Sequence, residues 1–327
     1  MKIESVRLEN FRGIRELELE FQDPGGKPLD LVVLAGPNGC GKTSVLEACL
    51  LACDYAFLPE NKDKPKYNIH NDAADFEIRL RVRDSTGAAS EVVRTKKTQP
   101  LVSDKDYDDS VRGVLSKTLI EYFSSWREPK LVGSRSVTAG KRGKRPLPNE
   151  ENRLWIVKQY LIDLTAYRAF RTPGSGDGLD PEFQRINAAW KLFYPNRDQR
   201  FIAEPASENI EEGFDLFLKN LDRNARVPVD SLSAGEIEVL TMLGWFAIKK
   251  SSVEILFIDE PELHLHQSWH RAVLKALRKV LPDTQIICAT HSPEVLDSVD
   301  YFQRFTLLED DDPRIRFSNG IEVGGEG

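Results

Sequence analysis

The feature that most constrains this chain is a glycine-rich turn between an apolar strand and a helix. The segment Gly36-Pro-Asn-Gly-Cys-Gly-Lys-Thr43 matches the pattern G-x-x-x-x-G-K-[ST]. Residues 31–35 before it form an apolar run, as expected for a strand buried on both faces of a sheet. The apolar residues after it share one helical face: Val45, Leu46, Cys49, Ala52 and Cys53. A chance turn would rarely have both flanks, so we predict a loop whose backbone N–H groups bind phosphate.

Two side chains of this loop extend the prediction from phosphate to a metal-bound nucleotide. Lys42 is placed to reach the β and γ phosphates, and Thr43 can offer its hydroxyl oxygen to Mg²⁺. The matching partner is the apolar strand 255–258, which ends in Asp259 and Glu260. Asp259 would hold the Mg²⁺ shell and Glu260 could polarise an attacking water. An acidic pair before Pro261 could equally cap the next helix, and these residues alone leave both interpretations open.

A third motif is ambiguous by itself. Ser233 and Glu236 in Ser231-Leu-Ser-Ala-Gly-Glu236 have the S-x-x-E spacing of a capping box, and an apolar helix follows. This spacing predicts the start of a helix whether or not the segment also binds a ligand.

Elsewhere the pattern predicts strands that alternate with helices, which favours an α/β fold with a parallel sheet. Near the N-terminus we expect two strands within 2–22, joined by Asn10-Phe-Arg-Gly13, and a hairpin of 76–82 with 91–95. Helices are expected near 151–162, 181–193 and 208–221. The C-terminal part should hold helices at 233–248 and 268–281 and strands at 253–258, 285–289 and 304–308.

These elements suggest one domain over 1–327 with a discontinuous core. We assign 1–60 and 231–310 to the nucleotide-binding core, 60–150 to an insertion with a hairpin and a basic loop, and 151–230 to a helical lobe. The basic loop stands out because residues 127–146 carry a net charge of +6 in a chain of net charge −7. Such a run is typical of a solvated surface, but it can also contact the phosphates of DNA or RNA.

Composition excludes several classes of protein. The longest apolar runs are strand-sized, well below the roughly 18 residues of a membrane span, and the N-terminus has no secretory pattern. Four cysteines in 327 residues are too few for a disulfide framework. We therefore expect a cytoplasmic protein that does not associate with membranes.

Taken together, four motifs in one order resemble the ATP-binding-cassette (ABC) ATPases. They are the phosphate loop, Leu232-Ser-Ala-Gly-Glu236, the segment FIDEPELHLH that contains Asp259, and Thr290-His291-Ser292 after a strand. The chain is most similar to the cytosolic branch that includes RecF, SMC and OLD-family ATPases, and Asn10-Phe11-Arg12-Gly13 also fits. This resemblance implies a P-loop NTPase with a mixed central sheet, an antiparallel β subdomain and a smaller helical lobe.

The resemblance also implies ATP and Mg²⁺ as cofactors and assigns residues to them. Catalytic roles fall to Lys42, Glu260 and the switch histidine His291, and metal binding to Thr43 and Asp259. The nucleotide-binding set comprises Arg12, Gly36, Pro37, Asn38, Gly39, Cys40, Gly41, Lys42, Thr43, Ser44, and the signature residues Ser233, Gly235 and Glu236. In the family, the signature contacts the γ-phosphate bound to the opposite subunit.

Partners follow from the same resemblance. One phosphate loop and one signature per chain imply a homodimer or a higher even oligomer. We expect ATP hydrolysis coupled to nucleic-acid transactions or to anti-phage defence through a separate effector protein such as a nuclease, with non-specific DNA or RNA as a further possible partner. Two alternatives stay open: a transporter motor subunit, and a regulatory scaffold whose ATP binding controls a partner protein.

Some features depart from the family or allow another interpretation. The glutamine expected at the joint between lobes has only Gln159 as a candidate, and frequent prolines exclude a long coiled coil. Only 36 residues follow His291, so we expect no nuclease domain in this chain. Three histidines, His264, His266 and His270, could bind a metal, although their spacing lacks the usual cysteine or carboxylate partners.

Overall fold

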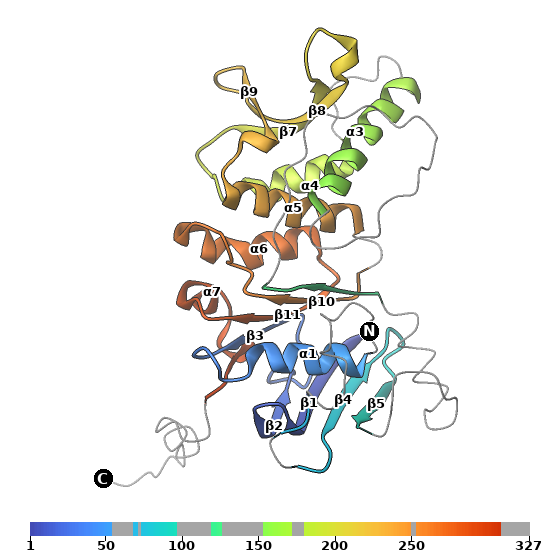
Figure 1. Cartoon of the computed structure of the whole chain (residues 1–327), viewed down its shortest axis with the longest axis vertical. Helices are drawn as coiled ribbons and strands as arrows, with labels where there is room; N and C mark the ends of the chain where they lie inside the picture. Colours follow the sequence, from blue (N-terminus) through green and yellow to red (C-terminus); the bar gives the residue numbers. More distant parts are fainter. Residues whose placement is uncertain are drawn as a thin grey trace. The chain divides into compact units, whose positions relative to one another are not determined.

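The computed structural model describes residues 1–53, 68–70, 73–96, 119–125, 153–171, 180–249 and 253–308. The chain divides into two compact units (Figure 1). Unit 1 comprises Met1–Tyr122, Glu254–Pro261 and Asp283–Gly327, and unit 2 comprises Phe123–Val253 and Glu262–Pro282. The basic segment 127–146 lies outside the described residues.

The described part of unit 1 forms two sheets. The central sheet has the order β12-β3-β11-β10-β6, and its strands are β3 (Leu31–Ala35), β6 (Ile120–Phe123), β10 (Ile255–Asp259), β11 (Gln285–Thr290) and β12 (Arg304–Thr306). The pairs β10–β11, β11–β3 and β12–β3 are all parallel. Every residue of β3, β10 and β11 is buried, as their continuous apolar sequences predict.

The second sheet of unit 1 is antiparallel, with the order β2-β1-β4-β5. It consists of β1 (Lys2–Phe11), β2 (Ile14–Glu20), β4 (Glu77–Arg83) and β5 (Ala89–Thr95). Both expected strand pairs are confirmed, and β4 also pairs with β1, so the hairpin extends the N-terminal sheet. Helix α1 (Lys42–Ala52) contacts β1, β4 and β5 of this sheet and β10 and β11 of the central sheet, and one apolar core joins all three layers.

The central sheet is completed by short elements at its C-terminal end. Helix α7 (Pro293–Asp297) starts at Ser292, whose hydroxyl accepts a hydrogen bond from the N–H of Val295. The 3-10 turn η6 (Tyr301–Gln303) leads into β12.

The described residues of unit 2 form four helices and a small sheet (Figure 1). The helices are α3 (Arg153–Arg171), α4 (Pro181–Trp190), α5 (Ala234–Lys249) and α6 (His270–Val280), and 3-10 turns occur at η3 (Ile210–Glu212), η4 (Val229–Ser231) and η5 (Gln267–Trp269). Helix α5 contacts α3, α4 and α6, and its residues 237–247 are buried. Helix α3 extends past the predicted end at 162, and Gln159 inside it donates a hydrogen bond to Asp163.

The helix predicted at 208–221 is wrong. That region holds η3 and then a strand, β8 (Phe214–Asn220), which pairs antiparallel with β7 (Gln199–Pro205) and β9 (Ala225–Pro228). Residues 215–218 are buried in succession, so both faces of the strand are covered, and the spacing of the apolar residues only imitates a helix. Gly213 has a φ of 68°, which breaks the chain between η3 and β8. The smaller lobe is therefore helical and β-sheet, not purely helical.

Candidate nucleotide site

The phosphate loop lies at the C-terminal end of β3 and leads directly into α1. Gly36 has a φ of 153°, and a Cβ atom there would lie 2.3 Å from the carbonyl oxygen of Leu307 and 2.7 Å from Cys40 Sγ. Because the nearest atom belongs to the backbone, only glycine fits at this first position of the motif. The loop is thus held against the end of β12 by a close backbone approach.

Lys42 lies on the inner side of this loop. Its side chain is mostly buried, and Nζ donates hydrogen bonds to the carbonyl oxygens of Gly36 and Pro37, each at 2.8 Å. The ammonium group therefore lies against the backbone of the first two residues of the motif. A mostly buried lysine whose carbonyl partners lie on a glycine-rich turn is well placed to bind an anion there.

Thr43 and Asp259 join the loop to the acidic strand end. Thr43 Oγ1 donates a hydrogen bond of 2.8 Å to Asp259 Oδ2, although 216 positions separate the two residues in sequence. The parallel order β3-β11-β10 explains this, since the C-terminal ends of neighbouring parallel strands share one edge of the sheet. Asp259 is only 2% exposed. A hydroxyl and a carboxylate oxygen side by side are donors of the type Mg²⁺ prefers.

Glu260 and His291 lie at the same edge of the sheet. Glu260 adopts a left-handed backbone conformation with a φ of 51°, and its N–H donates to the carbonyl oxygen of Ala289 at 2.8 Å. A non-glycine residue held in this conformation is strained, and such strain concentrates at functional sites. Its carboxylate oxygen Oε1 lies 3.5 Å from His291 Nδ1, and both side chains reach solvent. The structure thus brings two of the three predicted catalytic residues into direct contact.

Arg12 is held by residues that the sequence interpretation did not single out. It forms an ion pair with Glu47 of α1, whose side chain is fully buried, and Nε donates to Asn68 Oδ1 at 2.9 Å. The turn that carries Arg12 lies beside the phosphate loop, because a Cβ on Gly41 would be 3.1 Å from Ile14 Cδ1. The only available sequence signal for Glu47 is one acidic residue on the apolar part of α1.

The signature segment in unit 2 begins with the predicted capping box. The Ser233 N–H and hydroxyl both donate to Glu236 Oε2, at 2.9 and 2.8 Å, and the Glu236 N–H donates to Ser233 Oγ at 3.4 Å. The other carboxylate oxygen accepts a hydrogen bond of 2.7 Å from the hydroxyl of Tyr194, which sequence reasoning missed. Burial alone would raise the pKa of Glu236, but the hydrogen bonds from Tyr194 and Ser233 outweigh it and lower that pKa. Burial and the same carboxylate raise the pKa of Tyr194.

Gly235 brings the signature helix against the segment that contains the three histidines. A Cβ there would lie 2.7 Å from the carbonyl oxygen of His264, which itself has a φ of 65°. His266 Nδ1 binds Ser268, and His270 Nε2 lies 3.3 Å from the carbonyl oxygen of Leu265. Within the described ranges, no group of three or more histidine, cysteine or carboxylate side chains could hold a metal ion. These contacts favour a structural role for the histidines.

Comparison with protein families identifies the chain. A family model described as "AAA domain, putative AbiEii toxin, Type IV TA system" matches residues 31–297. The chain belongs to this AAA-domain family. The match includes the phosphate loop, the signature, the acidic strand end and His291.

Individual relatives of this AAA-domain protein are distant in sequence. The Septu protein PtuA of Bacillus thuringiensis is 22% identical over 355 aligned positions, which cover 99% of this chain and 81% of the relative. The probable ATPase of retron Vc95 from Vibrio cholerae serotype O1 biovar El Tor is 26% identical over 32% of this chain and 26% of its own length. The chain spans only 41% of a second Septu protein PtuA, from Bacillus mycoides (strain KBAB4), at 21% identity.

A solved structure supports the fold. The crystal structure of an SMC head bound to the C-winged helix domain of ScpA matches with a TM-score of 0.50, 13% identity and 92% coverage of each chain. The predicted resemblance to ABC-type ATPases of the RecF, SMC and OLD branch is confirmed, as is the predicted α/β fold class. Among the described residues, no helix combines the length and apolar character that crossing a membrane requires.

Proposed function

We propose that this AAA-domain protein binds ATP with Mg²⁺ and hydrolyses it in sites completed by a second copy of the chain. The observation that carries the proposal is the hydrogen bond between Thr43 and Asp259. It joins two motifs that are 216 positions apart, in the arrangement that a metal-bound nucleotide requires. The family and its relatives described as ATPases support the same activity.

The phosphate groups of ATP would bind along the loop from Gly36 to Ser44. The N-terminus of α1 adds the positive end of its dipole there. The ammonium group of Lys42 would exchange its bonds to the loop carbonyls for phosphate oxygens, which carry full negative charge. Thr43 and Asp259 would hold Mg²⁺, which neutralises phosphate charge when bound. Arg12, on the turn beside Gly41, would contribute a further positive charge if ATP competes with Glu47 for it.

Glu260 and His291 would act on the attacking water. Glu260 has a left-handed backbone directly after β10, and His291 Nδ1 lies 3.5 Å from its carboxylate oxygen. We assign Glu260 to orienting and deprotonating the water, and His291 to sensing the γ-phosphate. Both roles require a side chain next to the γ-phosphate. The contact between Glu260 and His291 is consistent with this requirement.

The signature would complete the site of a second copy. Each chain has one phosphate loop in unit 1 and one signature in unit 2. In the family to which the motifs belong, Ser233, Gly235 and Glu236 act on the nucleotide of the opposite subunit. The capping box supports this role, because it fixes the exposed Ser233 at the start of α5 with a helix N-terminus behind it.

The biological output that fits best is control of a separate effector protein in anti-phage defence, with a nuclease as one candidate. A Septu protein and retron ATPases among the relatives favour this setting, and a Rad50 ATPase from Methanopyrus kandleri that matches over 15% of the chain favours a nucleic-acid target. The basic segment 127–146 is our candidate for weak contact with DNA or RNA, and the cytoplasm is the expected location.

One experiment tests the hydrolytic core. Mg²⁺-dependent ATPase activity is measured for the native chain and for Glu260→Gln, which should keep ATP binding but lower turnover by roughly 10²-fold, the usual size of a general-base contribution. Glu16→Gln, on the exposed face of β2, is the matched control and should leave turnover unchanged. Equal turnover in the native chain and in Glu260→Gln would remove Glu260 from the mechanism.

A second pair of variants tests the metal site. Thr43→Ser keeps the hydroxyl, and Thr43→Val removes it without changing the shape of the side chain much. We expect Thr43→Val to need roughly 10–100-fold more Mg²⁺ for half-maximal ATP binding, and Thr43→Ser to resemble the native chain. The same Mg²⁺ requirement in all three proteins would contradict the assignment.

A further inference from the structure

A polar pocket in unit 2 lies at the start of the small sheet, outside the nucleotide site. Its volume is about 420 Å³, within the range of roughly 300–1,000 Å³ of ligand pockets. Gln199 of β7 and Asn220 of β8 are directly paired in the ladder, and both line the pocket. The remaining lining comes from the loop before β7 and the turn after β8: Asn196, Arg197, Asp222 and Arg223.

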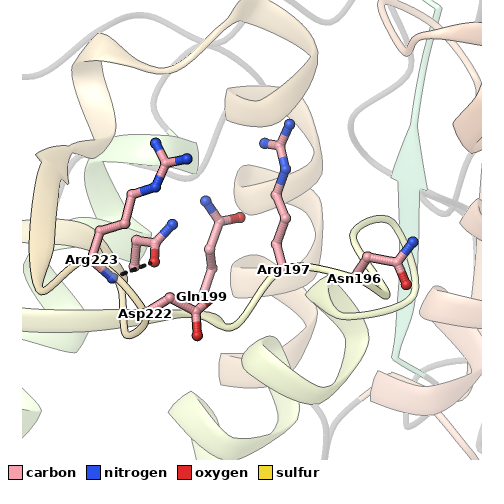
Figure 2. A pocket seen from close by; sticks show the side chains of 6 residues that line it. Asn196, Arg197, Gln199, Asp222 and Arg223 are labelled. Atoms are coloured by element: carbon pink, nitrogen blue, oxygen red, sulfur yellow. Dashed lines mark hydrogen bonds between the residues drawn. The ribbon is translucent and has the colours of Figure 1, made fainter.

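Two guanidinium groups dominate the charge of this pocket. Figure 2 shows the side chains of Arg197 and Arg223 extending in the same direction, with the amide of Gln199 between them. In the part of the chain that the structure describes, neither arginine forms an ion pair with a carboxylate. Asp222 also lines the pocket, so the lining carries a net charge of +1. The charge of Arg197 also helps to lower the pKa of the nearby Glu236 carboxyl, after burial and the hydrogen bonds from Tyr194 and Ser233, so Arg223 is the less compensated of the two. Two guanidinium groups that line one space attract an anion.

The Gln199 amide is a second, independent indication of a ligand. Its Oε1 atom is buried and has no hydrogen-bond partner among the described residues. Buried polar atoms in proteins are nearly always hydrogen-bonded, so an ordered water or a ligand is expected at this position. The amide oxygen and nitrogen can be exchanged by a 180° rotation, and then the same position offers N–H donors to an anion.

We propose that this pocket binds closely spaced phosphate groups, either of a free polyphosphate compound or of a nucleic-acid strand. Arginine recognises phosphate through paired N–H donors, and the amides of Asn196, Gln199 and Asn220 supply further polar contacts. The lining has no apolar side chain, which excludes a hydrophobic ligand.

The pocket is connected to the signature serine through three side-chain contacts. The guanidinium of Arg197 lies 4.7 Å from the centre of the Tyr194 ring, and the Tyr194 hydroxyl binds Glu236, which holds Ser233. A phosphate that draws Arg197 into the pocket would weaken its contact with the ring. Ligand binding would thereby change the position of the signature, a consequence that rests on the proposed function.

The test uses inorganic tripolyphosphate and the full chain carrying Lys42→Ala, so that the phosphate loop contributes little. Isothermal calorimetry should detect binding that weakens with salt, and Arg197→Gln/Arg223→Gln should lower the affinity tenfold or more. The matched control is Arg226→Gln on β9, whose guanidinium is paired with Glu204. It should change the affinity less than twofold. The proposal is overturned if neither tripolyphosphate nor a single-stranded oligonucleotide binds, or if all three proteins bind equally.

Two further arms identify the phosphate source and test the connection. A single-stranded oligonucleotide that binds with the same arginine dependence, while tripolyphosphate does not, assigns the site to a nucleic-acid strand. Trp269 packs edge-on against Tyr194 at 5.1 Å, so ligand binding should change a tryptophan emission that Trp269→Phe removes. Binding without that change overturns the connection to Ser233. None of these measurements requires ATP hydrolysis, so their failure is distinguishable from failure of the proposed function.

Discussion

The phosphate loop in unit 1 and the signature in unit 2 are positioned by different means. The loop is positioned mainly by backbone geometry. The parallel strands end at one edge of the sheet, Gly36 allows a close backbone contact, and Glu260 has a left-handed backbone conformation. The signature is positioned mainly by side-chain contacts. Tyr194 donates a hydrogen bond to Glu236, and a buried lysine forms an ion pair with the turn η4 before the signature. A site fixed by backbone tolerates changes of neighbouring side chains, whereas a site fixed by side-chain contacts depends on each of them.

The lysine is Lys158 of α3, which is fully buried and forms ion pairs with Asp215 of β8 at 2.8 Å and Asp230 of η4 at 2.7 Å. It connects a helix, a strand and the turn that leads into the signature. Because the two carboxylates are largely buried as well, they would lack a compensating positive charge without the lysine.

The largest expected effect tests whether the two regions act on each other in trans. Lys42→Ala and Ser233→Arg should each abolish ATPase activity when every subunit carries the change, because each destroys both composite sites of a dimer. Mixed dimers of the two variants would keep one intact site and regain activity. A mixture that stays inactive, although subunit exchange is demonstrated by labelled subunits, would refute the trans arrangement.

The next effect is on stability. Lys158→Met should destabilise unit 2 by about 3–5 kcal/mol, since it leaves two buried carboxylates without their cation. Chemical denaturation followed by tryptophan emission measures this change. Lys191→Met at the exposed C-terminal end of α4 is the control and should alter stability by no more than about 0.5 kcal/mol. Similar losses of stability in both variants would contradict a stabilising role of the buried ion pairs.

A smaller effect is expected at Tyr194, because its environment is partly exposed. Tyr194→Phe keeps the ring and removes one hydrogen bond to a carboxylate, which should cost about 1 kcal/mol. Tyr301→Phe, whose side chain is largely exposed, should cost less than about 0.5 kcal/mol. Equal denaturation midpoints for Tyr194→Phe and the native chain would show that the hydroxyl does not hold Glu236.

The smallest effect is a pH dependence with a defined sign. The pKa of Glu236 is lowered in the folded chain, so its stabilising contribution is present above the ordinary value of 4.5 and is lost as the pH falls below it. Between pH 7 and pH 3, native unit 2 should therefore lose more stability than Tyr194→Phe. Acid titration of the two proteins at fixed ionic strength measures the difference, and parallel curves would contradict it.

Most elements of unit 1 could be predicted from sequence because their signals are local. The loop between 36 and 43, the strand before it and the helix after it each depend on neighbours within a few positions, as does the capping box at Ser233 in unit 2. The strand β8 was predicted as a helix because four apolar residues over a short run fit both periods. Pairing with β7 and β9 along both edges and packing against α3 decided between them.

The motifs, their order and the class of chemistry follow from local sequence, since glycines, a lysine and paired carboxylates allow few other uses in that pattern. Tertiary structure alone decided which distant residues meet. It placed Thr43 against Asp259, Arg12 against Glu47, and Tyr194 against Glu236. The physical reason is that local propensity acts over a few residues, whereas these hydrogen bonds and ion pairs form only after packing brings separate strands and helices together.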